Sequence, residues 1–241
     1  MQIFSEKLTA AKQLLDSGKT VCLVGGGGKT TLMYALAQQR AQMGQRVLVG
    51  TTTHIYMPPR FYAADAGQAK LLWDQGDPAV IGTPVGEKLS ANPTLLAQLR
   101  VQADVTILEA DGAKGHPCKV PAEWEPVIDP ECDLVVAVFG LSAIGKPLHQ
   151  VCFRAEQAMA LLGVSGRHIL TPLDAARMLA SPQGSKKDAG TRRWCAVLNQ
   201  CDNGRCRKFA ADIVRNLENM GETNVVITAF DEREQTQWNR I

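Results

Sequence analysis

The stretch that decides the fold runs from Thr20 to Leu32 and reads TVCLVGGGGKTTL. Four glycines stand between an apolar run and the sequence Lys-Thr-Thr. Glycines let the backbone turn tightly, so that successive N–H groups can face phosphate oxygens, and a following helix adds partial positive charge at its N-terminus. We therefore predict a phosphate-binding loop (P-loop) for a nucleotide, formed by Gly25, Gly26, Gly27, Gly28, Lys29, Thr30 and Thr31.

Two side chains of this loop have expected roles. Lys29 would reach the β- and γ-phosphates, and the Thr30 hydroxyl would complete the shell of a Mg²⁺ ion. The loop departs from the pattern G-x-x-x-x-G-K-[ST], because Leu23 occupies the position of the first glycine. It reads G-x-x-G-K-T-T instead, as in Mur-type ligases and some related ATPases. The alternative is a glycine-rich turn between a strand and a helix, with a lysine on the surface.

Short apolar runs alternate with helical patterns over most of the chain. The stronger runs are continuous, which favours strands buried on both faces of a parallel sheet. Strands separated by helices predict an α/β fold of the P-loop NTPase type, a doubly wound, mostly parallel sheet with helices on both faces. No linker divides the chain, so we expect a single domain over residues 1–241. The expected strands are Val21–Val24, Val47–Gly50, Val105–Glu109, Leu134–Phe139, Trp194–Leu198 and Asn224–Thr228, with weaker candidates at Ala79–Gly82 and His168–Leu170.

The helices are predicted from the spacing of apolar residues and from terminal signals. Asparagine or threonine followed by proline is typical of an N-cap with proline at the first helical position, and glycine is typical of the position after the last turn. The predicted helices are Ser5–Asp16, Lys29–Met43, one that begins at Asn92-Pro93, one that begins at Thr171-Pro172, and Arg205–Met220.

Acidic residues follow the apolar run Val105–Leu108. Glu109 and Asp111 have the form of a Walker B element, whose carboxylates bind Mg²⁺ through water or activate the attacking water. Ligands of a parallel sheet bind at the carboxyl ends of its strands, which is where these residues are expected. We predict Thr30, Glu109 and Asp111 as the metal-binding residues, and Lys29, Glu109 and Asp111 as the catalytic ones. The alternative is a solvated acidic turn.

Hydroxyl groups and an imidazole follow the second predicted strand of the sheet. Thr52, Thr53 and His54 could hold a water of Mg²⁺, contact a γ-phosphate or orient a substrate. The alternative is a threonine-rich helix cap with a surface histidine. We predict these three residues on the substrate side of the site.

The sequence after Trp194–Leu198 reads Asn199-Gln200-Cys201-Asp202. It is similar to the N-K-x-D element by which many GTPases recognise guanine, where the aspartate accepts hydrogen bonds from the base. Gln200 stands in place of the lysine, so guanine specificity stays open between ATP and GTP. Asn199 and Asp202 are predicted nucleotide-binding residues.

Two long connections do not fit the alternation of strands and helices. Residues 110–130 hold four prolines and are too long for a passive link, so we expect a functional loop in which Lys114 and Lys119 could face a second substrate. Residues 181–193 are polar, and they suit either an active-site lid or a surface loop.

The overall composition excludes several partners. A net charge of +2 on 241 residues leaves no concentration of basic charge for nucleic acid or an anionic membrane surface. No run approaches the ~18–20 apolar residues that cross a bilayer. The N-terminal stretch lacks the apolar segment of a signal peptide. Seven scattered cysteines favour reduced thiols, in the core or on the surface, over disulfides or a metal site, so we expect a cytoplasmic protein.

Several of these stretches together resemble the YqeC family, whose members are described as accessory proteins of selenium-dependent hydroxylases (selenium cofactor biosynthesis). The resemblance covers about Leu23 to Asp202, and the long stretch around Glu109 is more specific than the P-loop. Gln200 and Phe153 depart from the family pattern, where lysine and histidine are usual. The matching stretches are LVGGGGKTTLM, TTTH, EADGAKGHPCKVPAEWEPVI, LSAIGKPL, FRAEQAMALLG and LNQCD.

The resemblance implies a nucleotide-binding protein that acts in the maturation of a selenium-dependent molybdenum hydroxylase or of its cofactor. Its expected partners are a nucleoside triphosphate, ATP or GTP, with Mg²⁺, and a molybdenum hydroxylase or another maturation protein. Arg154 is an expected residue of the substrate side. The competing interpretations are an ATP-dependent small-molecule kinase or Mur-like ligase, and a sensor that binds a nucleotide without chemistry.

Overall fold

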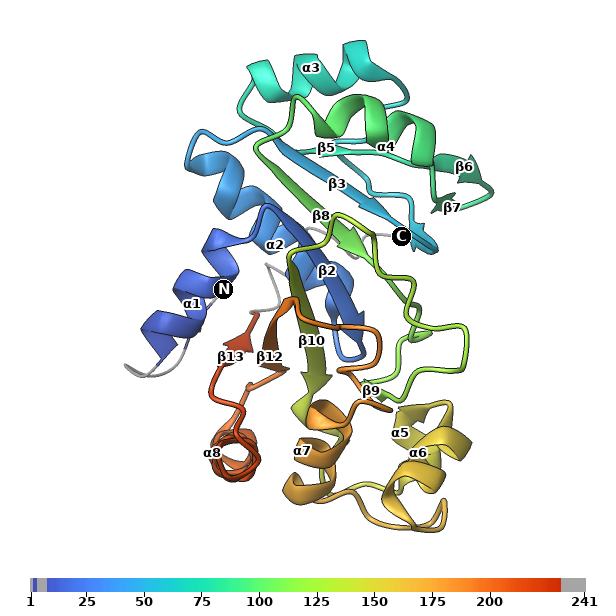
Figure 1. Ribbon diagram of the computed structural model, residues 1–241, viewed down its shortest axis with the longest axis vertical. Helices are drawn as coiled ribbons and strands as arrows, with labels where there is room; N and C mark the ends of the chain where they lie inside the picture. The colour runs from blue at the N-terminus through green and yellow to red at the C-terminus, as the bar shows by residue number, and fades with distance from the viewer. Residues whose placement is uncertain (1, 4–7, 231–241) are drawn as a thin grey trace.

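A computed structural model of the chain describes residues 2–3 and 8–230. Its centre is an eight-stranded sheet with the order β1-β13-β12-β10-β2-β8-β3-β5 (Figure 1). Neighbouring strands are parallel except β1, which runs antiparallel to β13. The strands are β1 (Gln2–Ile3), β13 (Val225–Ala229), β12 (Arg193–Asn199), β10 (Leu134–Gly140), β2 (Thr20–Gly25), β8 (Val105–Glu109), β3 (Val47–Thr51) and β5 (Ala79–Val80).

Helices cover both faces of this sheet, which confirms the predicted doubly wound α/β fold. α1 and α2 pack on one face, while α7 and α8 pack on the other, and α3 and α4 lie at the edge formed by β3 and β5 (Figure 1). Two short helices, α5 and α6, lie near α7. The helices are α1 (Leu8–Ser17), α2 (Lys29–Gln42), α3 (Ala66–Asp74), α4 (Pro93–Arg100), α5 (Leu148–Val151), α6 (Ala155–Leu162), α7 (Pro172–Ala180) and α8 (Gly204–Asn219).

The continuous apolar runs follow from this two-sided burial. In β10, Val136 and Val138 pack into the cluster that contains α1 and α2, whereas Val135 and Ala137 pack into the cluster that contains α7 and α8. Successive side chains of a strand point to opposite faces, so a strand that is covered on both sides needs apolar residues at every position. The residues of β10 are buried along its whole length.

Elements outside the central sheet differ most from the prediction. The weak strand candidate His168–Leu170 is wrong, because only Ile169 pairs, in an isolated bridge with Pro147. The His168 N–H donates to the Ser165 carbonyl at 3.0 Å and the Lys146 N–H to the Ala143 carbonyl at 3.3 Å, so neither donor extends the bridge into a ladder. The first residues of the predicted helix Ser5–Asp16 lie outside the described residues. The sequence did not predict a three-stranded sheet of β4 (His54–Tyr56), β6 (Thr83–Val85) and β7 (Lys88–Ser90), nor a pair of β9 (Cys118–Lys119) and β11 (Cys152–Phe153).

The long connection 110–130 lies beside the phosphate loop. The His116 carbonyl accepts the N–H of Gly27 at 3.0 Å, and the Pro117 carbonyl accepts the N–H of Gly140 at 2.7 Å. The other long connection, 181–193, packs against it, because Lys187 donates to the Glu125 carbonyl at 2.5 Å. No helix in the described part of the chain has the length and apolar content that crossing a membrane requires.

Candidate nucleotide-binding site

The glycines between β2 and α2 adopt backbone conformations that other residues reach with strain. Gly25, Gly27 and Gly28 have φ angles of 94°, 90° and 97°, in the left-handed region. Space is also restricted, since a Cβ on Gly27 would lie 2.3 Å from the nitrogen of Gly140. Gly28 is the N-cap residue of α2, which begins at Lys29. The glycine run therefore brings the chain from the sheet into the helix through a turn that a side chain would block.

Part of the predicted phosphate cradle is occupied by the protein itself. The N–H of Gly25 donates to the Asp111 carboxylate, that of Gly26 to the Val138 carbonyl, and that of Gly27 to the His116 carbonyl, at 3.0–3.2 Å. The first N–H groups of an α-helix have no acceptor inside the helix, and here they belong to residues 28–31. The N–H groups placed to meet an anion are therefore those at the start of α2.

The Lys29 side chain is buried beside two carboxylates. Its Nζ lies 3.1 Å from Asp111 Oδ1 and 3.9 Å from Glu109 Oε1, and it donates to the Gly25 carbonyl at 2.6 Å. Burial lowers the pKa of Lys29, but the charges of Asp111 and Glu109 outweigh that effect and raise it. Lys29 is therefore a charged group held at the end of the phosphate loop.

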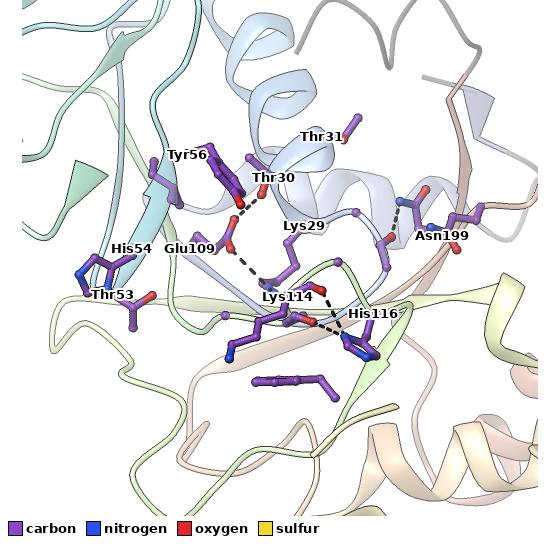
Figure 2. Close-up of a pocket in the computed structure, with 18 of the residues that line it drawn as sticks. Lys29, Thr30, Thr31, Thr53, His54, Tyr56, Glu109, Lys114, His116 and Asn199 are labelled. Atoms are coloured by element: carbon purple, nitrogen blue, oxygen red, sulfur yellow. Dashed lines mark hydrogen bonds and ion pairs between the residues drawn. The ribbon is translucent and has the colours of Figure 1, made fainter. Parts of the chain in front are cut away.

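Thr30 and Glu109 lie in direct contact at the first turn of α2. The Thr30 hydroxyl donates to Glu109 Oε2 at 2.8 Å, and both residues line the cavity described below (Figure 2). Burial raises the pKa of Glu109, while Lys29 and Thr30 oppose that rise. A hydroxyl and one carboxylate fit Mg²⁺, which takes oxygen ligands and usually keeps several waters beside one or two protein groups and substrate phosphates. No group of three or more His, Cys, Asp or Glu side chains in the described chain could hold a metal by itself.

Asp111 lies behind the cavity wall rather than in it. It is 1% exposed, and its carboxylate contacts Lys29 and Lys119, each at 3.1 Å, as well as the N–H of Gly25. Lys119 in turn contacts Glu125 at 2.9 Å, and Glu125 contacts Arg154 at 2.8 Å. In this structure Asp111 holds the phosphate loop and its lysine in place.

A cavity of about 900 Å³ opens over the phosphate loop at the carboxyl edge of the sheet (Figure 2). It brings together most of the predicted site residues, although Gly25, Gly26, Asp111 and Lys119 are not in its wall. Thr52 also faces elsewhere, because its hydroxyl donates to the Val127 carbonyl at 2.7 Å and it lines a separate cavity of about 190 Å³. The predicted residues in the wall are Gly27, Gly28, Lys29, Thr30, Thr31, Thr53, His54, Glu109, Lys114, Arg154, Asn199 and Asp202.

The end of β12 forms one end of this cavity. In Figure 2, Asn199 lies on one side of Lys29, and Thr53 and His54 lie on the other. The Asn199 amide is buried, donates to the Gly27 carbonyl at 2.8 Å and accepts from Thr228 at 2.9 Å. Asn199 therefore fixes β12 to the phosphate loop, and Asp202 is left exposed in the wall.

Several wall residues were not predicted as site residues. Tyr56 and Lys88 come from the small sheet, and the Lys88 Nζ lies 4.8 Å above the Tyr56 ring. These strands have three residues each, which is too short for a clear pattern in the sequence. Phe153 also lines the cavity, and Arg154 follows it with a φ of 64° at the N-cap of α6.

Most of the cysteines lie in the core of this fold. All seven are unpaired, and six are buried. Cys195 lies inside β12, where burial raises its pKa to about 12. A thiol that stays protonated in the core is neither a nucleophile nor a metal ligand.

The fold and the geometry of the loop define an α/β protein of the P-loop NTPase type. The family model described as "YqeC protein" matches residues 21–156, more than half of the chain. The chain is 33% identical over 205 residues to a protein of Escherichia coli (strain K12) described as "Uncharacterized protein YqeC", covering 76% of this chain and 77% of that protein. The chain belongs to the YqeC family.

A weaker similarity relates the chain to HypB from Helicobacter pylori, whose crystal structure was determined in complex with nickel. The sequence identity is 10%, the TM-score is 0.37, and the match covers 97% of this chain and 90% of that chain. A similarity of this size supports no inference about function.

Proposed function

We propose that the protein binds and hydrolyses a nucleoside triphosphate with Mg²⁺, and that it serves as an accessory protein in the maturation of a selenium-dependent molybdenum hydroxylase or its cofactor. The observation that carries the nucleotide part is the cluster of Lys29, Thr30 and Glu109 at the first turn of α2, in the wall of a large cavity. It joins a lysine, a hydroxyl and a carboxylate at a helix N-terminus, which is a favourable position for phosphate.

Each group of this cluster has a task in the proposal. The N–H groups of residues 28–31 donate to phosphate oxygens, and Lys29 places its charge against the β- and γ-phosphates. Thr30 and Glu109 supply oxygen atoms towards Mg²⁺, which neutralises charge on the phosphates when it is bound. Asp111 acts through Lys29 by holding it at the loop.

The exposed Asp202 supports recognition of the base at the β12 end of the cavity. Asn199 joins this end to the phosphate loop through Gly27, and Asp202 lines the same cavity as the loop. The proposal therefore assigns the base of one nucleotide to Asp202 and its phosphates to the loop. An aspartate at this position accepts from the N–H groups of guanine, which favours GTP. Adenine offers no matching pair of donors at this edge.

The accessory role rests on membership of the YqeC family together with the resemblance described above. A maturation factor of this kind is expected to turn over slowly alone and faster with its partner, a molybdenum hydroxylase or a cofactor-maturation protein.

Calorimetric titration with ATP and GTP, each with Mg²⁺, tests the nucleotide part, with Lys29→Ala as the variant. Loss of one charged contact costs about 1.5–3 kcal/mol, which is about 10- to 150-fold in affinity. Nucleotide affinity that is unchanged in Lys29→Ala would refute the assignment of the loop. A preference for ATP would refute the proposed role of Asp202.

A second candidate function is an ATP-dependent small-molecule kinase or Mur-like ligase. The favouring observation is that the cavity continues past the phosphate loop to Lys114 and Arg154, where an acceptor would fit. Turnover that requires a small acceptor supports this candidate, whereas turnover stimulated by a protein partner supports the first.

A further inference from the structure

Positive charge gathers around one aromatic ring in the cavity wall. Arg154 Cζ lies 4.9 Å from the centroid of the Phe153 ring, and the Nζ atoms of Lys114 and Lys119 each lie 5.5 Å from it. The His116 ring is tilted against the same phenyl ring, with the centroids 5.7 Å apart. These groups come from the connection 110–130 and from the start of α6, which meet here.

The carboxylates nearby do not balance these cations. Glu125 is shared between Lys119 and Arg154, and Asp111 is shared between Lys119 and Lys29. Lys114 has no carboxylate within ion-pair distance among the described residues, and its side chain is exposed in the cavity wall. Glu109 also lies 3.9 Å from Lys29, so three carboxylates face three of the cations. The unbalanced positive charge is that of Lys114, which favours an anion.

Two of these residues have a backbone conformation that is unfavourable for residues other than glycine. Lys114 has a φ of 46° and Arg154 a φ of 64°, both in the left-handed region. Such conformations cost about 1–3 kcal/mol each outside glycine and persist where the surrounding structure fixes them, often at ligand sites. Three of the five non-glycine residues with positive φ in the described chain line this one cavity, namely Lys114, Arg154 and Gln200.

The contacts of His116 fix which ring nitrogen can meet a ligand. Its Nδ1 lies 3.1 Å from the Ala113 carbonyl oxygen and 3.2 Å from that of Lys114. A carbonyl only accepts, so Nδ1 carries the hydrogen and Nε2 is the nitrogen left for the cavity. The backbone carbonyl of the same residue accepts from Gly27, so His116 follows the phosphate loop closely and lines the same cavity (Figure 2).

We propose that Lys114, His116 and Arg154 form an anion subsite beside the phosphate loop, which holds the carboxylate or phosphate group of a small second substrate. The proposal rests on the nucleotide-binding part of the proposed function, because it assigns the loop itself to the triphosphate. Lys114 and Arg154 bind the oxyanion, and His116 Nε2 faces the part of the substrate nearest to the loop. Both cations lie beside the Phe153 ring.

The test is a titration of inorganic phosphate into the full chain saturated with Mg²⁺ and a non-hydrolysable triphosphate, which fills the loop. Lys114→Gln and Arg154→Gln are the variants. Lys208→Gln is the matched control, because it removes an equal charge from an exposed position of α8 that is not in the cavity wall. A second titration, with acetate, shows which oxyanion the subsite prefers.

We expect the wild-type chain and the control to bind one phosphate beside the triphosphate. Each subsite variant should weaken that binding at least about tenfold, the loss of one charged contact, while the affinity for the triphosphate stays within about twofold. Absence of phosphate binding to the loaded wild-type chain overturns the subsite. A loss of triphosphate affinity in both variants as large as their loss of phosphate affinity also overturns the subsite, because Lys114 and Arg154 then bind the nucleotide.

Triphosphate binding, measured first and without phosphate, distinguishes failure of the two proposals. If no triphosphate binds, the proposed function fails, and phosphate is titrated into the nucleotide-free chain and into Lys29→Ala. Binding that survives Lys29→Ala and is lost in Lys114→Gln still supports the subsite. Binding that is lost in Lys29→Ala instead overturns it.

Discussion

Replacement of Asp111 by asparagine removes one buried negative charge and keeps the shape of the side chain. The carboxylate is 1% exposed and contacts Lys29 and Lys119, each at 3.1 Å. It also accepts the N–H of Gly25, the first residue of the phosphate loop. An amide can accept from Gly25, but it cannot offset the charges of two buried lysines.

The size of the stability loss depends on which carboxylates remain near Lys29 and Lys119 in the variant. Removal of one partner from a buried ion pair costs about 3–5 kcal/mol, because an uncompensated charge stays behind. Lys29 keeps Glu109 at 3.9 Å, and Lys119 keeps Glu125 at 2.9 Å, so neither is left without a carboxylate. We therefore expect Asp111→Asn to lower the free energy of unfolding by about 3 kcal/mol. For a chain of this length that corresponds to a Tm lower by about 6–12 °C.

Urea and thermal unfolding of the wild-type chain and two variants measure this loss. The matched control is Asp104→Asn, which breaks a 3.1 Å ion pair with Arg46 whose side chains are 42% and 52% exposed. An exposed pair of this kind contributes less than about 1 kcal/mol. Equal losses in the two variants, or a loss below about 1 kcal/mol in Asp111→Asn, would refute the reasoning from burial.

Three further predictions follow from the same site. Gly27→Ala should abolish nucleotide binding, because its Cβ would lie 2.3 Å from the Gly140 nitrogen, whereas Gly44→Ala, with a similar φ and open space, should leave the nucleotide Kd unchanged. Burial raises the pKa of Glu125, but Arg154 and other donors outweigh that effect and lower the pKa from 4.5 to about 2. The ionised carboxylate therefore stabilises the fold fully above pH 4.5, and this stabilisation is lost as the pH falls towards 2. Glu125→Gln should lower the free energy of unfolding by about 3 kcal/mol at pH 7 and remove this part of its decrease at acid pH, as measured by urea unfolding at several pH values. An equal decrease in stability between pH 4.5 and pH 2 in both proteins would contradict this. Glu109→Gln should lower the rate of hydrolysis and its Mg²⁺ dependence more than the nucleotide affinity, and an unchanged rate would exclude Glu109 as a metal-side group.

The central sheet was predictable because its strands are buried on both faces. Such strands leave continuous apolar runs in the sequence, and all six strong candidates are strands of the sheet. The small sheet was not predictable, because β4, β6 and β7 are short and mostly exposed, so burial imposes no pattern on them. Its residues Tyr56 and Lys88 nevertheless reach the cavity, and no local signal marks them.

The residues of the candidate site that the sequence predicts are those defined by their local neighbourhood. The glycine run, Lys29 and Thr30 are adjacent in the sequence, and Glu109 follows a clear strand, so each is found from its own neighbourhood. The task of Asp111 depends instead on contacts across 86 positions to Gly25 and on Lys119, which stays close only because the connection folds back. Spacing alone assigns Asp111 to the metal, since it cannot show two lysines on either side of the carboxylate.

These long-range contacts form a series of ion pairs, alternating in sign, that runs from the phosphate loop to the cavity wall. Lys29, Asp111, Lys119, Glu125 and Arg154 follow one another at 3.1, 3.1, 2.9 and 2.8 Å. Each carboxylate is shared between two cations, so no member of the series changes partner without affecting the next. Lys29 is consequently charged and fixed before any ligand arrives, and the entropic cost of ordering it belongs to folding rather than to binding. A phosphate must still compete with Asp111 and with the Gly25 carbonyl for the Lys29 ammonium group. The contacts that order the loop therefore also lower its affinity for an anion.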